Sequence, residues 1–404
     1  MPHLAPFRGL RYRPVVGAIA DVLVPPYDAL TDDLAAQLRE RSRWNLIHVE
    51  APVPARGSLT RAHAQAGARF RGWIADGVLE WDREPGFYIY RHRFDYGGAR
   101  LSRLGLIGLL QLHEWAEHVV CPHERTHPHV VADRLALLAA CRANLSLGIA
   151  LVKDPHQRLL TMLAAAPYAE PPTTVSTPDG AEHEAGRVTD QDWCRAIQER
   201  LRYARLYVAD GHHRYEAALA YRRTGGAIGS DYVMTHVVTA HDAGLTILPS
   251  HRILHGTVPP DPSRLAGVDV SAAPPEASGN PGSWDFRGHV WLVQGDRILR
   301  VRPRGAGNDV IRLNATAQAL IDTASSDHAP CQITTTPDAE LAVALVATGA
   351  AVAAILAPPA LPDVVTRVAD QRRLLPPKST YFWPKPLAGL VLRTLDGPDA
   401  YGRT

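Results

Sequence analysis

The feature that most constrains the fold is a short apolar run that passes through a polar turn directly into a helical pattern. Residues 205–209 (RLYVA) have the composition of a buried strand, and residues 215–222 have the periodicity of a helix. A strand that leads straight into a helix is typical of chains whose strands and helices share a core. Between them we expect a polar loop made of Asp210, Gly211, His212, His213 and Arg214.

The rest of the chain also mixes strands and helices, so the sequence predicts an α/β or α+β fold. Residues 87–95 and 101–112 are predicted to pair as a hairpin across Gly97-Gly98, and residues 290–293 and 298–302 as a second one. Two stretches rich in Pro, Gly, Ser and Ala, 164–186 and 258–284, are typical of connectors. The 404 residues indicate two or three packed units. We expect an N-terminal α/β region (1–110), a core (111–255) and a C-terminal α/β region (256–404).

Charge, cysteine content and hydropathy narrow the class of protein. Lys and Arg number 43 against 41 Asp and Glu, a net charge of +2, and no block of like charge indicates a nucleic-acid surface. Four widely spaced cysteines fit a reducing cytoplasm better than a disulfide framework. The run 341–357 is membrane-like but rich in alanine, which favours a buried helix, a glycine stop and a buried strand. We therefore expect a cytoplasmic protein with no signal peptide and no membrane segment.

The expected loop at 210–214 has the residues of a phosphate-binding site. A loop that opens a helix presents free backbone N–H groups and the positive end of the helix dipole. Gly211 lets the backbone approach a ligand, His212, His213 and Arg214 add donors and positive charge, and Asp210 can hold Mg²⁺ or orient a hydroxyl. The alternative is a helix N-cap at Asp210 with exposed histidines. We favour the functional interpretation because four chemically capable side chains are adjacent.

His123-Glu124-Arg125-Thr126-His127 matches the HExxH pattern of zinc peptidases. That chemistry needs both histidines on one face of a continuous helix. Pro122 and Pro128 flank the segment, so any helix there would be about one turn long. A zinc hydrolase is therefore a minor alternative. Near a phosphate loop Glu124 has another use, because a carboxylate can take a proton from an attacking hydroxyl.

Lysine is confined to three positions, Lys153, Lys378 and Lys385, and every other basic residue in the count is arginine. Two of the three lie in the segment 376–385 (PPKSTYFWPK). Because lysine offers a compact ammonium whereas arginine offers a planar fork, this clustering suggests a need for ammonium groups there. The alternative is coincidence. The motifs GxxxxGK[ST], GxGxxG and GxSxG are absent, which excludes the commonest NTPase, dinucleotide and serine-hydrolase sites. Asp28 lies in a predicted turn, and Asp133 and Arg134 are expected to form an ordinary ion pair.

Several motifs together resemble the bacterial and archaeal domain-of-unknown-function family 1015. In chain order they are PPYD at 25–28, HE at 123–124 with Thr126, DR at 133–134, ADGHHRYE at 209–216, LPSHR at 248–252 and PKSTYFWPK at 377–385. The resemblance covers nearly the whole chain, and DGHHRYE with PKSTYF is its most specific part. That family is similar to the ParB/sulfiredoxin-like group and, within it, to free-serine kinases. The resemblance implies a core of that fold with an added N-terminal α/β region.

The resemblance also implies roles for individual residues. Glu124 would be the general base, and Asp210 would act with Mg²⁺ or with the nucleophile. Phosphate would be held by Gly211, His212, His213 and Arg214. The amino-acid substrate or the transferred phosphoryl group would be held by Lys378, Ser379 and Thr380, with His123 beside them.

We therefore hypothesise a small-molecule phosphotransferase, a nucleotide-dependent free L-serine kinase that forms O-phosphoserine with Mg²⁺ and with ATP or ADP as donor. The alternative is a ParB-like nucleotide-binding regulatory protein without phosphoryl transfer, and a third possibility is an inactive relative that scaffolds other proteins. The expected partners are serine or a similar small molecule and a nucleotide, with neither membrane nor nucleic acid. The kinase hypothesis requires Glu124 and Asp210 to lie within about 10 Å of each other.

Overall fold

A computed structural model describes residues 1–54, 58–256, 259–273, 280–305, 309–324 and 331–398. The fold is α/β with mixed sheets, as the sequence predicts. The chain forms two compact units. Unit 1 comprises Met1–Pro122, Thr126–Leu245 and Pro384–Thr404, and unit 2 comprises His123–Arg125 and Thr246–Trp383. This division differs from the three expected segments, because strands from 1–110 and from 111–255 share one sheet.

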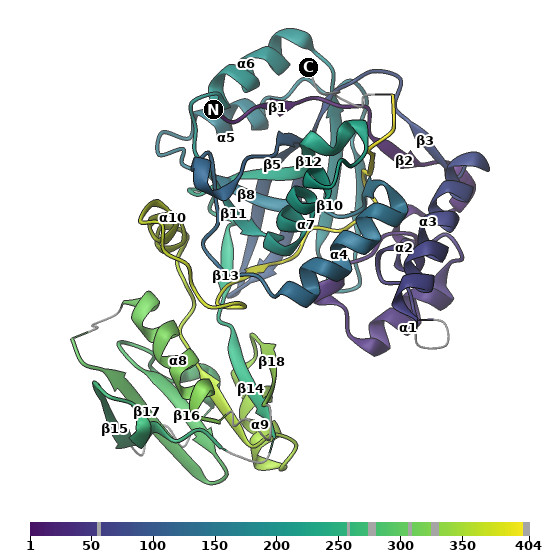
Figure 1. Cartoon of the computed structure of the whole chain (residues 1–404). Coiled ribbons are helices and arrows are strands. Elements are labelled where there is room, and N and C mark those ends of the chain that lie inside the picture. Colours follow the sequence, from purple (N-terminus) through teal and green to yellow (C-terminus); the bar gives the residue numbers. More distant parts are fainter. Residues whose placement is uncertain (55–57, 257–258, 274–279, 306–308, 325–330, 399–404) are drawn as a thin grey trace. The chain divides into compact units, whose positions relative to one another are not determined.

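Within the described residues, unit 1 is built on a sheet of nine strands in the order β6-β11-β8-β12-β5-β4-β10-β9, with β1 on β5 (Figure 1). Neighbours are antiparallel except for the parallel pairs β6–β11 and β8–β12. The strands are β1 (Leu4–Ala5), β4 (Phe87–Tyr96), β5 (Ala99–Gln111), β6 (Val120–Cys121), β8 (Gly148–Val152), β9 (Thr173–Ser176), β10 (Glu182–Val188), β11 (Leu206–Asp210) and β12 (Tyr232–Thr239). The hairpin expected across Gly97-Gly98 is confirmed as β4–β5.

The connector expected at 164–186 is wrong, because β9 and most of β10 lie there. β10 alternates buried His183 with the charged Glu182 and Glu184. In the antiparallel register with β4 these two glutamates face Arg93 and Arg91, and both pairs form ion pairs. Opposite charges on facing positions stabilise a sheet, so a strand with few large apolar residues is still held.

Helices α5, α6 and α7 of unit 1 pack on the large sheet, and α4 lies beside α7 (Figure 1). Strand β4 shows how the two faces are filled. Phe87 and Ile89 pack into one core with residues of α5, α6 and α7, whereas Tyr88 and Tyr90 pack into another with residues 387–391. The helices are α1 (Asp32–Arg41), α2 (Ile47–Glu50), α3 (Leu59–Ala75), α4 (Pro128–Cys141), α5 (Arg158–Ala164), α6 (Gln191–Leu201) and α7 (His212–Arg223).

Two short antiparallel pairs complete unit 1. β2 (Leu10–Tyr12) pairs with β3 (Leu79–Trp81), and β7 (Ala143–Asn144) pairs with β21 (Arg393–Thr394). Residues 393–394 are therefore tied into unit 1.

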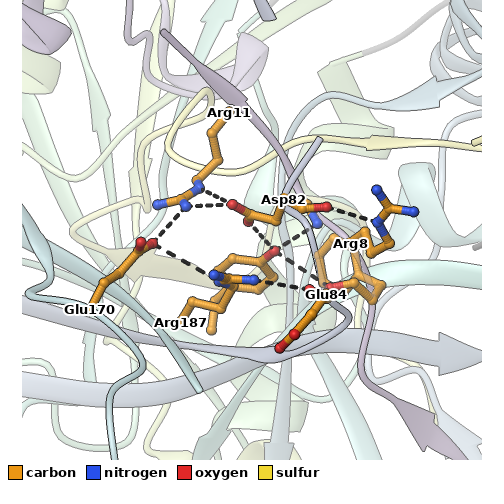
Figure 2. Close-up of polar contacts among 9 residues, drawn as sticks. Arg8, Arg11, Asp82, Glu84, Glu170 and Arg187 are labelled. Atoms are coloured by element: carbon orange, nitrogen blue, oxygen red, sulfur yellow. Dashed lines mark hydrogen bonds and ion pairs between the residues drawn. The ribbon is translucent and has the colours of Figure 1, made fainter. Parts of the chain in front are cut away.

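A polar network ties the N-terminal segment to the sheet (Figure 2). Arg11 donates to the carboxylates of Asp82 and Glu170, and Arg187 of β10 lies 3.9 Å from Glu170. Asp82 is buried and also accepts the hydroxyl proton of Tyr88 at 2.6 Å. These bonds satisfy polar groups that would otherwise be costly to bury, so β2 is fixed beside β4 and β10.

Unit 2 has, among its described residues, a sheet of six strands in the order β15-β17-β16-β19-β14-β18. Its strands are β14 (His251–His255), β15 (Val268–Ala272), β16 (Val290–Gln294), β17 (Arg297–Pro303), β18 (Gln332–Thr336) and β19 (Ala353–Leu356). Its helices are α8 (Val310–Ala324), α9 (Ala339–Ala347) and α10 (Pro362–Asp370), and a separate pair joins β13 (Thr246–Leu248) to β20 (Tyr381–Trp383).

Two expectations for unit 2 are confirmed. The second predicted hairpin is β16–β17. The membrane-like run at 341–357 consists of most of α9, Gly349 and the buried strand β19. No helix in the described part of the chain combines the length and the apolar character that crossing a membrane requires.

A cluster of buried histidines lies on the large sheet of unit 1. His92, His183 and His236 are at most 2% exposed, and Arg103 between them is fully buried. Burial lowers the pKa of all three histidines, and the positive charge of Arg103 adds to the effect; the pKa of His183 falls to about 4. Neither ring nitrogen of His236 has a hydrogen-bond partner among the described residues. The three histidines are therefore uncharged near pH 7 when unit 1 is folded.

This cluster predicts that unit 1 loses stability below neutral pH. An unfolded histidine binds a proton near pH 6.5, whereas the pKa of folded His183 is about 4 and burial holds the pKa values of His92 and His236 well below the usual value. Because each histidine gains a proton only on unfolding, each should lower the unfolding free energy by about 1.4 kcal/mol when the pH falls from 7.5 to 5.5. Denaturant unfolding at both pH values measures this loss. His236→Leu should reduce it by about one histidine's share, and replacement of the exposed His129 by Gln should not. An equal loss in all three proteins would contradict the prediction.

Candidate functional site

The first group of candidate residues lies where β11 meets α7 in unit 1. Asp210 is the last residue of β11, and Gly211 is the N-cap of α7 with φ of 88°. This left-handed conformation favours glycine, and a Cβ here would also lie 3.1 Å from the backbone of Gly148. The helix begins at His212, so the expected loop is one residue long. His212, His213 and Arg214 form the first turn of α7 instead, because a glycine cap reverses the chain without a longer loop.

Asp210 is the centre of a charge cluster in unit 1. One of its carboxylate oxygens accepts from Arg214 at 2.8 Å, and the other forms an ion pair with the ammonium of Lys385. The same ammonium lies 3.5 Å from Asp28. All four side chains are at most 15% exposed. Two cations and two carboxylates are therefore held together with little water between them.

The sequence motifs did not identify Lys385 as a candidate site residue. The available signal was the scarcity of lysine, which singled out the whole segment without separating Lys385 from Lys378. The position of Asp28 beside Lys385 also gives a role to a turn that the sequence left undecided.

Arg214 has donors that none of the described residues accepts. Its Nε and Nη1 atoms are buried and have no hydrogen-bond partner among the described residues, although Nη2 binds Asp210. Arg214 lines a cavity of about 70 Å³ with Glu50, Arg134 and Ser146. This volume holds a few waters or one small anion, since one water needs roughly 10–15 Å³ of such space. Burial raises the pKa of Glu50, whose carboxylate accepts from Ser146 at 2.8 Å.

The two histidines of α7 are buried, unlike the exposed pair of the N-cap alternative. The Nε2 atom of His213 accepts the backbone N–H of His127 at 2.9 Å, and the rings of His213 and His127 are stacked. One turn later, Glu216 accepts from the hydroxyl of Thr126 at 2.5 Å. Nε2 of His213 is therefore not a donor to a ligand in this structure, and α7 anchors the chain just after Glu124.

The second group of candidate residues lies in unit 2, where Glu124 is bound by the segment 378–380. Its Oε1 accepts the backbone N–H of Lys378 at 2.6 Å, and its Oε2 accepts those of Ser379 and Thr380 at 3.0 and 3.2 Å. The Thr380 hydroxyl also donates to Oε2 at 3.2 Å and lies 2.9 Å from Nε2 of His123. Unit 2 therefore brings together His123, Glu124 and all three candidate residues of the C-terminal segment.

Arg252 supplies positive charge beside this segment. It is 2% exposed and donates to Asn314 at 2.7 Å and to the Ser379 hydroxyl at 3.2 Å. Burial lowers the pKa of Arg252 to about 10, against the raising effect of the negative charge of Glu124. Burial also raises the pKa of Glu124, against the lowering effect of its backbone donors. The LPSHR motif thus acts beside the 378–380 segment, where Ser250 also donates to the carbonyl of Lys378 at 2.5 Å.

The zinc alternative lacks the geometry that it needs. Residues 123–127 are not helical, and His127 is the N-cap of α4, which begins at Pro128. Across the described ranges, no group of three or more His, Cys, Asp or Glu side chains is arranged to hold a metal ion. The expected ion pair of Asp133 and Arg134 is confirmed at 2.6 Å.

The comparisons with known proteins give one family and several distant structures. The family described as "Protein of unknown function (DUF1015)" matches residues 4–267. No curated protein matches the chain.

Three solved structures are similar at low identity. A free serine kinase in complex with AMP is 11% identical with a TM-score of 0.39, covering 65% of this chain and 83% of its own. SbnI with C-terminal truncation from Staphylococcus aureus is 11% identical with a TM-score of 0.39, covering 72% and 90%. A conserved hypothetical protein from Pyrococcus furiosus is 13% identical with a TM-score of 0.38, covering 66% and 90%.

The charge cluster predicts that Lys385 is needed for the stability of unit 1. Lys385→Met leaves Asp28 and Asp210 with one cation fewer in a site with little water, so the unfolding free energy should fall by about 3 kcal/mol. Lys153→Met is the matched control, since this lysine is exposed and should cost less than about 1 kcal/mol. Denaturant unfolding of both variants measures the difference. Equal unfolding free energies would contradict the prediction, because they would show that Asp28 and Asp210 are well solvated.

Proposed function

The chain belongs to the DUF1015 family, and we propose that it is a small-molecule phosphotransferase, a nucleotide-dependent kinase that converts free L-serine to O-phosphoserine. The observation that carries the proposal is the charge cluster of Asp210, Arg214 and Lys385 at the start of α7. Phosphoryl transfer asks a protein mainly to align the reactants and to neutralise charge, and this cluster offers the groups for both.

The donor phosphates bind at the first turn of α7. The first backbone N–H groups of a helix have no partner within the helix and carry partial positive charge. Arg214 adds two buried guanidinium nitrogens without a partner among the described residues. An anion that reaches these atoms gains charge-assisted hydrogen bonds and loses little to competing water.

Asp28 and Asp210 fit a magnesium ion that arrives with the nucleotide. Their carboxylates already share one cation, the ammonium of Lys385. Mg²⁺ prefers oxygen ligands and usually binds one or two carboxylates together with substrate phosphates and water. The ion supplies charge neutralisation on the donor phosphates. With the ion held by Asp28 and Asp210, Lys385 would be available to neutralise charge on the phosphate oxygens.

Glu124 acts as the general base on the serine hydroxyl. Burial raises the pKa of this carboxyl, which makes it a better proton acceptor. The serine oxygen then attacks the terminal phosphorus of the donor, and the bond from that phosphorus to the nucleotide breaks. Lys378 neutralises charge on the transferred group or on the serine carboxylate.

The proposal requires both groups of residues to act on one substrate. A Glu124–Asp210 separation well above about 10 Å in a ligand-bound crystal structure would contradict a shared substrate.

A nucleotide-binding regulator without transfer is the second candidate. Its support is the Glu124 carboxylate, which already accepts four hydrogen bonds from residues 378–380. A carboxylate with these hydrogen bonds can have a purely structural role. The regulator predicts nucleotide binding by calorimetry with no phosphorylated product.

The kinase proposal predicts phosphoserine in a ³¹P NMR assay of the full chain with serine, Mg²⁺ and either ATP or ADP. Glu124→Gln and Asp210→Asn should each reduce the rate by at least about 100-fold, because each removes a group that acts on the reacting atoms. Glu340→Gln, at an exposed position of unit 2, is the control and should keep the rate. Absence of product from folded protein, across both donors and a panel of amino acids, would contradict the proposal.

A further inference from the structure

We infer that residues 378–380 form an anion-binding nest, which the Glu124 carboxylate fills in this structure and which a phosphoryl group can take over. A nest is a concave run of successive backbone N–H groups that point at one anion. The identity of the anion as a phosphoryl group rests on the proposed function. Anion capture by the nest itself does not require any transfer.

The donors of the nest are arranged as an oxyanion needs them. Three successive N–H groups, those of Lys378, Ser379 and Thr380, lie within 2.6 to 3.2 Å of one carboxylate. Lys378 has a φ of 58°, which is the left-handed conformation. Successive backbone N–H groups converge on one anion where left-handed and right-handed residues adjoin. The Thr380 hydroxyl adds a fourth donor at 3.2 Å. The Glu124 carboxylate thus stands where oxygens of a tetrahedral phosphoryl group can accept the same bonds.

The positive charge of Arg252 beside the nest favours a bound anion even when the Glu124 carboxylate leaves the nest. Arg252 contacts the Ser379 hydroxyl, is 2% exposed, and has no ion-pair partner within 4.0 Å among the described residues. Its nearest compensation is the negative charge of Glu124, which acts on it without direct contact. A buried cation that loses its compensation is costly, so a departing carboxylate has to be replaced by another anion. A phosphoryl group carries more charge than a carboxylate and therefore fits this position.

The surroundings hold the nest in place independently of Glu124. Ser250 donates to the carbonyl of Lys378, and the Ser379 hydroxyl donates to the carbonyl of Pro376 at 2.7 Å. Leu375 donates its N–H to the carbonyl of His123 at 2.8 Å and accepts that of Arg125 at 3.1 Å. The backbone on both sides of Glu124 is thus fixed by hydrogen bonds that do not involve its side chain. Anion binding in the nest would then release the carboxylate as a proton acceptor.

The experiment is a titration of the full chain with inorganic phosphate, followed by calorimetry. Glu124→Ala empties the nest, so phosphate should bind at least 10-fold more tightly than to the unmodified chain. Glu340→Ala is the charge-matched control, because it removes an exposed carboxylate of the same unit, and it should leave phosphate affinity unchanged. Glu124→Ala with Arg252→Gln should lose the gain, which separates the nest from phosphate bound at α7. An equal affinity of Glu124→Ala and Glu340→Ala would overturn the inference.

A second variant covers the case in which Glu124→Ala does not fold, as circular dichroism would reveal. Glu124→Gln keeps the volume of the side chain and removes its charge, so phosphate should bind at least 3-fold more tightly. No gain in this folded variant also overturns the inference. If only the kinase proposal is wrong, phosphate would still bind the emptied nest while no phosphoserine forms. Phosphoserine formation without any gain in phosphate affinity would reject the nest alone.

Discussion

A lysine ammonium held between two aspartates organises unit 1 around the start of α7. Charged groups are expensive to bury, and they are retained only where partners with good geometry surround them. Lys385 meets that condition with Asp210 and Asp28, and it comes from the last part of the chain. Strands β4 and β5 hold the segment that carries Lys385, since Arg103 donates to the carbonyl of Pro384 and the Tyr90 hydroxyl accepts the N–H of Leu387. The large sheet therefore positions Lys385 through its neighbours along the chain.

The family motifs divide between the two units, and each unit builds its own polar cluster from them. PPYD, DR and DGHHR contribute to unit 1, and HE and LPSHR contribute to unit 2. The C-terminal motif is itself divided, because Trp383 is the last residue of unit 2 and Pro384 the first of the returning unit 1 segment. One motif thus supplies Lys378 to one cluster and Lys385 to the other. This division explains why two lysines within eight residues are not interchangeable.

Local signals in the sequence predicted local structure well. The two hairpins, the strand before DGHHR and the helix–glycine–strand run near residue 349 all follow from patterns within about 20 residues. β10 was not predictable in this way, since its partner strand β4, which carries the ion-pair residues Arg91 and Arg93, lies some 90 residues away in the sequence. Arg252 was part of a recognised motif, yet its contact with Ser379 spans 127 residues. Such partners are set by tertiary packing, which a single sequence does not reveal.

The order of the segments in unit 1 has a consequence for synthesis on the ribosome. Unit 1 is interrupted after Leu245, and its last contributions, Lys385 and β21, follow only after the whole of unit 2. At ordinary translation rates these residues are added roughly 7 to 28 s after Leu245. During that interval Asp28 and Asp210 have been made but their shared cation has not, and β7 lacks its partner strand. The nascent chain must therefore pass through a state in which unit 2 can fold before unit 1 is complete.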